Sequence, residues 1–417
     1  MQRTCGHEGG AEGRICVHLA QDEDLSFLSR FTGAGTEYWV VCSACGDVEA
    51  PPLVTVCESC VRDREQYVLS WGGLRGRPEV RVRASSLAFR QTEVQVPGLA
   101  GATSAAAAAL VDGDRSAWLV VQDGALWRVD VEPDGGRMIR VCALAGQLEG
   151  EDLRIEVAPD GRFAAVVERR GQYGVVLEVA SGAITMRLDR GRYHVSQYDF
   201  ACVFAADGAL VHATEWNRLD VSDPATGELL TPRTASEGAG GRPEHALDYF
   251  HAGLSVSPDG RWLVDDGWVW HPCGFLRRMD LQRWRHENPW ETEDGPSLLD
   301  LRLVNYFWDA PRCFVDDRTL VVWGFGFDDE AMVDAALVFD VETGARLRWF
   351  AGPPRGRFVF DRHLIVVAAE GTSVWDVATG ERLLAAPGLA PQAFHPVTRE
   401  HATFAAGAVV LSRLVEE

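Results

Sequence analysis

Residues 254–270 read LSVSPDGRWLVDDGWVW, and this stretch predicts the fold of most of the chain. Two apolar runs flank a Pro-Asp-Gly turn at 258–260, and a third apolar run follows them. Asp-Gly supplies the positive φ angles that tight hairpins need, and alternating residues give each strand one buried face. The stretch therefore predicts a strand, a turn, a second strand and then a third strand.

A second stretch shows the other half of the same repeating unit. Residues 372–388 read TSVWDVATGERLLAAPG, which predicts a strand ending at Trp375-Asp376, a turn at Thr379-Gly380 and an outer strand. Similar turn signatures recur at intervals of about 36 to 58 residues, around the ~40–50 residues of a four-stranded propeller blade. These signatures lie at residues 112–114, 159–161, 207–208, 258–260, 316–318, 361–362 and 396–398.

Seven signatures predict an all-β chain folded as a seven-bladed β-propeller, although six or eight blades also fit the spacing. The sequence after Gly388 is short of one strand, and residues 85–98 precede the first signature and have strand character. Their pairing would join the two ends of the ring and remove an open edge. We therefore expect a zinc-binding module at 1–70, a linker at 71–84 and a propeller at 85–417.

Three segments carry a family resemblance: SPDGRWLV at 257–264, APDGRFAAV at 158–166 and VWDVATGERL at 374–383. They resemble WD40-like and YVTN-type bacterial β-propellers, and the likeness covers roughly residues 85–417. The chain departs from strict WD40 repeats, because only Trp375-Asp376 forms the terminal dipeptide and no Gly-His opens a blade. The resemblance implies a bacterial protein whose propeller is a platform for protein–protein interaction.

The first sixty residues hold four pairs of metal-ligand residues: Cys5-x-His7, Cys16-x-His18, Cys42-x-x-Cys45 and Cys57-x-x-Cys60. Because Zn²⁺ in structural sites takes four ligands, eight ligands predict two ions. Closed shells leave no position for water or substrate, so both ions are expected to be structural. A module with few large apolar side chains needs such metals in order to fold.

Two pairing schemes fit these ligands. In the sequential scheme the first two pairs hold one ion and the two Cys-x-x-Cys pairs hold the other. In the cross-braced scheme the first pair joins the third and the second joins the fourth. The Cys-x-x-Cys pairs, one after a strand and one before a helical run, resemble a treble-clef finger. CVHL (16–19) with YWVVCSAC (38–45) is similar to ubiquitin-binding zinc fingers of the UBP type, which implies recognition of a ubiquitin-like tag as an alternative function.

The chain carries a formal charge of −21 from 61 acidic and 40 basic residues, and every basic residue is Arg. Such a field repels the phosphate backbone of nucleic acids. Two short basic groups, Arg75 to Arg83 and Arg277 to Arg285, are interpreted as solvated loop charge. The N-terminus has no apolar signal-peptide region and the chain has no run of 18 apolar residues. We therefore expect a cytoplasmic protein that binds neither nucleic acid nor membrane.

The sequence contains no nucleophile elbow, phosphate loop, dinucleotide fingerprint or zinc-protease motif. The leading prediction is therefore a non-enzymatic scaffold that binds a protein partner. A propeller enzyme of the lactonase or hydrolase type, acting on a small molecule at the channel mouth, is the alternative. Residues 279–297 are predicted to form a loop, and Arg and Trp dominate binding hot spots. The predicted partner contacts are Arg283, Trp284, Arg285 and Trp290, while the partner and the oligomeric state stay open.

Overall fold

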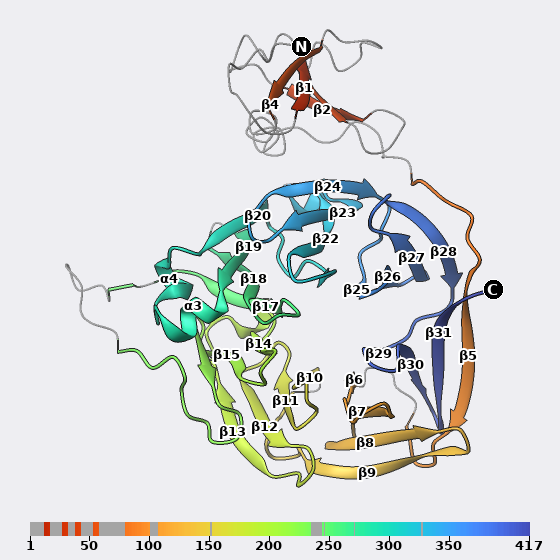
Figure 1. Cartoon of the computed structure of the whole chain (residues 1–417). Helices are drawn as coiled ribbons and strands as arrows, with labels where there is room; N and C mark the ends of the chain where they lie inside the picture. The colour runs from red at the N-terminus through yellow and green to blue at the C-terminus, as the bar shows by residue number, and fades with distance from the viewer. Residues whose placement is uncertain are drawn as a thin grey trace.

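The computed structural model contains a ring of seven antiparallel β-sheets around a central axis (Figure 1). It describes residues 12–16, 27–31, 38–42, 53–57 and 80–417, the last range without 101–106, 151, 235–243, 246, 271 and 327. The prediction of an all-β, seven-bladed propeller is confirmed. No helix among the described residues is long and apolar enough to cross a membrane.

Each blade runs outward from an inner strand, and strands adjacent in sequence pair with each other. Blade one holds β6 (Ala107–Ala109), β7 (Ser116–Gln122), β8 (Ala125–Glu132) and β9 (Gly135–Ala143). Blade two holds β10 (Leu153–Val157), β11 (Phe163–Glu168), β12 (Tyr173–Glu178) and β13 (Ile184–Asp189). Blade three has three strands, β14 (Cys202–Phe204), β15 (Leu210–Glu215) and β16 (Arg218–Ser222).

The remaining blades have four strands each. Blade four holds β17 (Phe250–Val256), β18 (Trp262–Val269), β19 (Cys273–Asp280) and β20 (Leu299–Asn305). Blade five holds β21 (Arg312–Phe314), β22 (Thr319–Phe325), β23 (Val333–Asp340) and β24 (Arg346–Ala351). Blade six holds β25 (Arg357–Asp361), β26 (His363–Ala368), β27 (Gly371–Asp376) and β28 (Glu381–Pro387). Blade seven holds β29 (Ala393–His395), β30 (Glu400–Ala405), β31 (Ala408–Glu416) and β5 (Leu87–Gln95).

The seventh sheet joins strands from distant parts of the sequence. β5 is antiparallel to β31 over nine residue pairs, from Gln95 opposite Ala408 to Leu87 opposite Glu416 (Figure 1). A side-chain hydrogen bond of 3.4 Å from Gln91 to Ser412 adds to this pairing. Because the first described propeller strand completes the last sheet, the ring has no break between its last and first blades.

The stretch 254–270 forms two strands and not three. Its first turn lies between β17 and β18 as expected, but the whole run 262–269 is the single strand β18. Gly267 lies inside this strand. Its position requires glycine, because a Cβ there would lie 2.2 Å from the Phe250 carbonyl oxygen. The Gly267 N–H donates to the Tyr249 hydroxyl at 2.9 Å. This glycine therefore permits a close packing contact and does not mark a turn.

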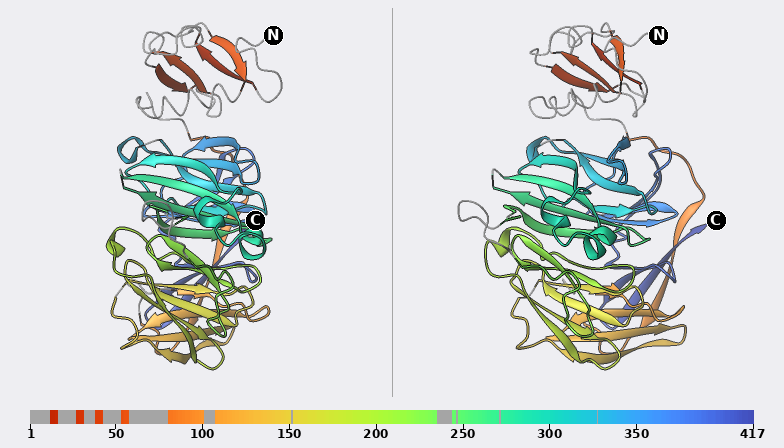
Figure 2. Two further views of the ribbon diagram at one scale, coloured as in Figure 1. Left: turned by 90° about the vertical axis from the view of Figure 1, so that its left-hand side faces the viewer. Right: turned by 60° about the vertical axis from the view of Figure 1, so that its left-hand side comes forward.

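The two faces of the ring carry different connections. Since neighbouring strands are antiparallel, the turn between the second and third strands of a blade lies on the same side as the link to the next blade. We call this side the connection face. The turns between first and second strands and between third and fourth strands lie on the opposite face. Figure 2 shows the ring from the side.

Apolar side chains fill the wedges between blades. One cluster joins blades four, five and six through Trp262, Leu320, Trp349 and Trp375, each at most 4% exposed. Each side chain of this kind contributes roughly 1.5–3 kcal/mol when fully buried. Packing between blades therefore supplies much of the driving force for closing the ring.

Arginines also tie neighbouring blades together through backbone carbonyls. Arg154 of blade two donates to the carbonyl oxygens of Phe200 at 2.6 Å and Cys202 at 3.2 Å, at the start of blade three. Arg357 of blade six donates to the carbonyls of Pro391 and Gln392 at 2.7 and 2.8 Å, and burial lowers its pKa to about 10. Such charge-assisted bonds link blades without the motif residues of strict WD40 repeats.

Residues 80–86 lie along the edge of blade six. Arg83 donates its backbone N–H to the Arg382 carbonyl at 3.0 Å, and Arg382 donates back to the Arg81 carbonyl at 2.8 Å. The Arg83 side chain pairs with Asp376 at 2.7 Å and Glu381 at 3.3 Å. The interpretation of this basic group as solvated loop charge is therefore wrong for Arg81 and Arg83. Arg75 and Arg77 lie outside the described residues.

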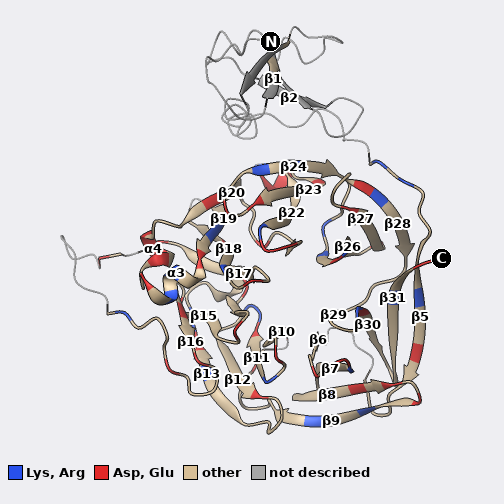
Figure 3. Cartoon of the chain, in the orientation of Figure 1, with Lys and Arg blue, Asp and Glu red and all other residues tan. Residues whose placement is uncertain are grey.

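The second basic group is also structured. Arg277, on β19, pairs with Asp300 at 2.6 Å and lies 4.4 Å from the centre of the Tyr249 ring. Arg278 donates to the Val341 carbonyl of blade five at 2.8 Å. Charges of both signs are spread over the strands of the ring (Figure 3). These arginines are part of the packing and not of a solvated loop.

A separate four-stranded sheet lies near the N-terminus, with strand order β2-β3-β1-β4. Its strands are β1 (Glu12–Cys16), β2 (Phe27–Phe31), β3 (Tyr38–Cys42) and β4 (Leu53–Cys57). β1 is parallel to β3 and antiparallel to β4.

Candidate functional site

The structure places three of the eight predicted metal ligands at strand ends. Cys16, Cys42 and Cys57 are the last residues of β1, β3 and β4. The other five, which are Cys5, His7, His18, Cys45 and Cys60, lie outside the described residues. No group of three or more His, Cys, Asp or Glu residues that could hold a metal occurs within the described ranges. The two zinc sites therefore stay predictions.

The strand register bears on how these ligands could pair. Ile15 is opposite Val40 in the parallel pair, so β1 and β3 are adjacent strands that terminate at the same end of the sheet, at Cys16 and Cys42. Cys57 is opposite Glu12 in the antiparallel pair, so β4 terminates at the other end of the sheet. The register therefore places Cys16 near Cys42, an arrangement that neither the sequential nor the cross-braced scheme requires.

Three of the four predicted partner contacts lie on one short helix on the outside of the ring, and the fourth, Trp290, directly precedes a second short helix (Figures 1 and 2). α3 (Leu281–His286) and α4 (Glu291–Asp294) connect β19 to β20. The expected loop is therefore helical here: Asp280 caps α3 by accepting the Arg283 N–H at 2.9 Å. Trp284 is 1% exposed and packs in the core of blades two to four, so it cannot contact a partner in this structure.

The rest of this insert covers the incomplete third blade. Arg233 lies between the insert and β16, 6.0 Å from the Trp284 ring centre and 5.4 Å from that of Trp290. Its guanidinium pairs with Asp220 at 3.1 Å and Glu293 at 2.6 Å, with all three side chains at most 6% exposed. Leu229 forms a single antiparallel bridge to Ser222 of β16, where a fourth strand would lie, and the insert packs its Trp rings over Arg233 in the same link.

Two other predicted contacts also have partners inside the protein. Arg285 pairs with Asp207 of blade three, and its own side chain is only 12% exposed. Trp290 stacks on His245 with a centroid distance of 4.5 Å. Arg283 is 44% exposed and faces Glu287 at 3.6 Å. Trp284 and Arg285 are therefore used in internal packing, while Arg283 and Trp290 stay predicted partner contacts.

A different set of aromatic residues is exposed on the connection face, over blades three to five. It comes from the link between β13 and β14, the turn of blade three, the turn of blade four and the link between β20 and β21. We call it the aromatic surface, and its members are Tyr193, His194, Trp216, Trp270, Tyr306 and Trp308. Tyr193 is 46% exposed, Trp270 is 42% exposed and Tyr306 is 63% exposed.

Buried rings support the aromatic surface from below. Phe250 stacks on Trp268 at 4.3 Å, and Trp268 stacks on Trp308 at 4.9 Å. Tyr193 lies parallel to Phe250 at 5.8 Å, and the Trp308 indole N–H donates to the Gln197 carbonyl at 2.9 Å. Offset and edge-to-face contacts of this kind contribute roughly 0.5–1.5 kcal/mol per pair. The exposed Tyr193 and Trp270 rings therefore rest on packed, buried rings.

The backbone of the aromatic surface is strained at three points. His194, Tyr306 and Asp309 have φ values of 53°, 55° and 64°, in the left-handed region that non-glycine residues rarely adopt. Seven described non-glycine residues have positive φ, and three of them lie here. Strained positions persist where the surrounding structure holds them, and they concentrate at functional sites.

An enclosed arginine fixes the loop that carries Tyr193 and His194. Arg190 is fully buried, and it donates to the carbonyls of Gly171 and Asp199 at 2.9 Å and of Tyr198 at 3.1 Å. Its guanidinium also lies 4.4 Å from the Tyr198 ring centre. Burial lowers the pKa of Arg190 to about 10. Without a carboxylate partner, this residue acts as a hydrogen-bonding centre for the loop.

Asp309 is the most perturbed acid beneath the aromatic surface. Burial, together with the nearby carboxylates of Asp199 and Asp266, raises the pKa of Asp309 to about 7. Its Oδ1 atom is buried and has no hydrogen-bond partner among the described residues. Asp199, in contrast, accepts a bond from Arg169 at 2.8 Å. A carboxyl with such a pKa can hold or release a proton near neutral pH.

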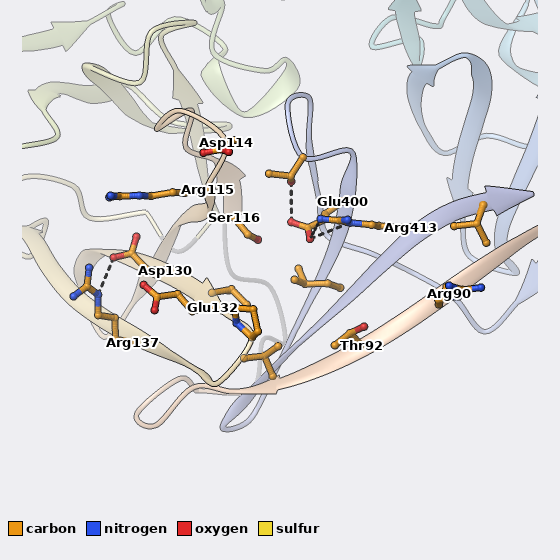
Figure 4. Close-up of a pocket in the computed structure, with 16 residues that line it drawn as sticks. Arg90, Thr92, Asp114, Arg115, Ser116, Asp130, Glu132, Arg137, Glu400 and Arg413 are labelled. Carbon is orange, nitrogen blue, oxygen red and sulfur yellow. Dashed lines mark hydrogen bonds and ion pairs between the residues drawn. The ribbon is translucent and has the colours of Figure 1, made fainter.

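A cleft of about 760 Å³ lies elsewhere, between blades seven and one (Figure 4). Val94, Val131 and Leu411 line its apolar part. Its charges are largely paired: Glu400 accepts from Arg413 at 2.8 Å, and Asp130 accepts from Arg137 at 3.0 Å. Four arginines balance four acids along its wall, so the cleft selects no ligand by charge.

Sequence reasoning did not identify the aromatic surface. The Trp268-Val269-Trp270 pattern was available, but two Trp residues at alternate positions usually pack between blades. The structure buries Trp268 at 3% exposure and leaves Trp270, at the turn, exposed. The useful signal was Trp270, an aromatic residue that lies just beyond the end of strand 262–269.

Comparison with known proteins identifies the fold and nothing finer. The chain is similar to a chain in the crystal structure of the mitotic checkpoint complex, with 12% identity and a TM-score of 0.51 over 82% of this chain and 98% of that one. It is also similar to a chain of Kuenenia stuttgartiensis hydrazine synthase, with 15% identity and a TM-score of 0.49 over 77% of this chain and 96% of that one. No family model and no curated protein matches the chain. At identities this low, the likeness establishes a shared propeller fold.

Proposed function

We propose that this protein is an interaction scaffold that binds a protein partner on the aromatic surface. The observation that carries the proposal is the exposure of Tyr193, Trp270 and Tyr306 together on one face of a rigid propeller. Tyr and Trp are the residue types most enriched in binding hot spots. The similarity to a chain of the mitotic checkpoint complex, which is itself an assembly, supports this role at the level of the fold.

The exposed rings of the aromatic surface have apolar area that the isolated chain does not cover. Large aromatic side chains bury about 150–250 Å² each when they are covered, and that gain is unused in the isolated chain. A left-handed Tyr306 also adds a backbone cost that the fold alone does not require. A partner that covers the rings would realise this gain, and backbone strain of the Tyr306 kind concentrates at functional sites.

The test compares two double variants in affinity capture from the native lysate with quantitative mass spectrometry. Trp270→Ala/Tyr306→Ala removes rings of the aromatic surface. Ile139→Ala/Leu347→Ala removes exposed apolar side chains, 44% and 57% exposed, from outer strands. We expect the first variant alone to lose stoichiometric partners that the wild type retains. Equal recovery with both variants would reject the aromatic surface as the binding site.

We further propose that two structural Zn²⁺ ions stabilise the N-terminal module. The support is the four ligand pairs together with the strand register, which sets Cys16 near Cys42 at one end of the sheet and Cys57 at the other. One ion would then take Cys16, His18, Cys42 and Cys45, and the other would take Cys5, His7, Cys57 and Cys60. Thiolate and imidazole are ligands that Zn²⁺ prefers.

Zinc content of the purified full chain tests this arrangement. We expect about two ions per chain. Cys16→Ser and Cys42→Ser should each weaken the same ion, so that the double variant loses no more zinc than either single variant. Combining Cys16→Ser with Cys57→Ser should remove both ions. Loss of both ions from the Cys16→Ser/Cys42→Ser variant would contradict this arrangement. The cross-braced scheme would then predict loss of one ion from the Cys16→Ser/Cys57→Ser variant, and the sequential scheme would predict loss of both.

A further inference from the structure

We propose that the segment bound by the aromatic surface is basic, with Lys or Arg side chains that lie against the exposed rings and pair with an adjacent acidic turn. This inference rests on the proposed function and names the chemistry of the partner. The acidic turn comprises Asp328, Asp329 and Glu330, between β22 and β23.

The acidic turn is attached directly to the aromatic surface. Asp328 forms an isolated β-bridge with Asn305, the residue before Tyr306. Asp328 also accepts the Glu330 N–H at 3.1 Å, which starts a short 3-10 helix and fixes the turn. Asp329 and Glu330 are exposed. The turn of blade five thus presents carboxylates beside the most exposed ring of the surface.

Elsewhere in this protein, aromatic rings are regularly covered by arginines. Arg277 lies over Tyr249, and Arg355 lies over Phe307 at 4.9 Å. In the part of the chain that is described, no arginine lies over Tyr193, Trp270 or Tyr306. Cation–π contact is worth roughly 0.5–2 kcal/mol, and rings left open in this way can accept cations from a partner.

The charges around the surface favour a cation over an anion. Exposed Glu215 precedes Trp216, and the three acids of the acidic turn adjoin Tyr306. On the basic side, Arg169 and Arg170 both pair with Asp199, at 2.8 and 3.6 Å, and Arg192 is exposed. Together with the overall charge of −21, this balance would repel an acidic segment and attract a basic one.

Direct binding to short blocked peptides tests the inference on the full chain. The probes are alternating Lys-Gly, Arg-Gly and Glu-Gly peptides with acetylated and amidated ends, measured by fluorescence anisotropy. We expect binding of both basic peptides and none of the acidic one. Asp328→Asn/Asp329→Asn/Glu330→Gln should weaken binding about tenfold or more. Trp270→Ala/Tyr306→Ala should weaken it by roughly threefold to tenfold.

A charge-matched control separates this site from general attraction to an acidic protein. Asp114→Asn/Glu132→Gln/Asp134→Asn removes three exposed acids from turns on the opposite face. This variant should bind within about twofold of the wild type, since charges more than a Debye length of ~10 Å away are largely screened. Equal weakening by both triple variants, or no binding of the basic peptides, would overturn the proposal.

The absence of lysine gives a second, independent readout. Carbodiimide joins a Lys amine to a carboxylate, and this chain has no Lys side chain that could react with its own acids. The Lys-Gly peptide should therefore become attached to residues 328–330, as located by mass spectrometry. Attachment elsewhere would reject the site. Suppose that native partners are lost from the Trp270→Ala/Tyr306→Ala variant but stay bound to the wild type at high salt. The scaffold proposal would then survive, and the proposal of a basic partner would not.

Discussion

Two regions of this protein are rich in aromatic side chains, and they use these side chains in opposite ways. In the α3–α4 insert, Trp284 is buried, and Arg233 from the link after β16 joins the buried Asp220 of β16 to the buried Glu293 of the insert. In the aromatic surface, Trp270 and Tyr306 are exposed, and no arginine among the described residues covers them. The difference shows that hot-spot composition alone does not identify a binding site. What matters is whether the chain already supplies the partners for these side chains.

The largest effect is expected in the insert. Trp284→Ala should lower the free energy of unfolding by about 3–5 kcal/mol, because it leaves a cavity in the core of blades two to four. Calorimetric or denaturant unfolding measures this loss. Trp270→Ala is the matched control, and we expect a loss of under about 1 kcal/mol from an exposed position. Similar losses in both variants would remove the distinction between the two regions.

Arg233→Gln should cost roughly 3 kcal/mol. The substitution leaves Glu293 buried without its cation, while Asp220 keeps the Arg218 bond at 2.8 Å. Double-mutant cycles with Glu293→Gln measure the coupling between the two side chains. A coupling energy near zero would mean that Arg233 does not hold the insert against blade three.

Asp309→Asn should stabilise the protein by roughly 3 kcal/mol at pH 8 and have little effect at pH 4. The pKa of Asp309 is raised to about 7, so the folded state holds a proton that the unfolded state releases. Stability from this group is therefore present below the unfolded value near pH 4 and is lost as the pH rises to 7. Asn also tolerates the left-handed backbone. A pH-independent difference in thermal midpoint would contradict this account.

The smallest effect on stability is expected from Tyr306→Gly. Glycine relieves the φ of 55° but adds chain entropy to the unfolded state, so the net change should stay within about 1 kcal/mol. Binding of a basic peptide should fall nevertheless, by roughly threefold. Unfolding and anisotropy measured on the same sample separate the two effects, and a large loss of stability with intact binding would reverse the assignment.

The fold was predictable because its signals are local. Turns such as Thr379-Gly380 are encoded by adjacent residues and recur at 226–227 and 343–344, and the strand ending at Trp375-Asp376 and the outer strand after it are confirmed. The insert was mispredicted although Asp280 and Arg283–Glu287 spacing are ordinary helix signals. The aromatic surface could not be predicted from the sequence, because the exposure of Trp270 depends on whether loops of other blades cover this side chain.

The pairing of β5 with β31 also sets an order for folding during synthesis. Gln91 and Ser412, which meet in that sheet, are 321 residues apart in the chain. At about 5–20 residues per second, β5 emerges roughly 15 to 60 s before its partner strand exists. During that interval six blades can form while β5 has no partner strand. Chaperone binding to residues 87–95 on the ribosome would be a direct sign of this delay.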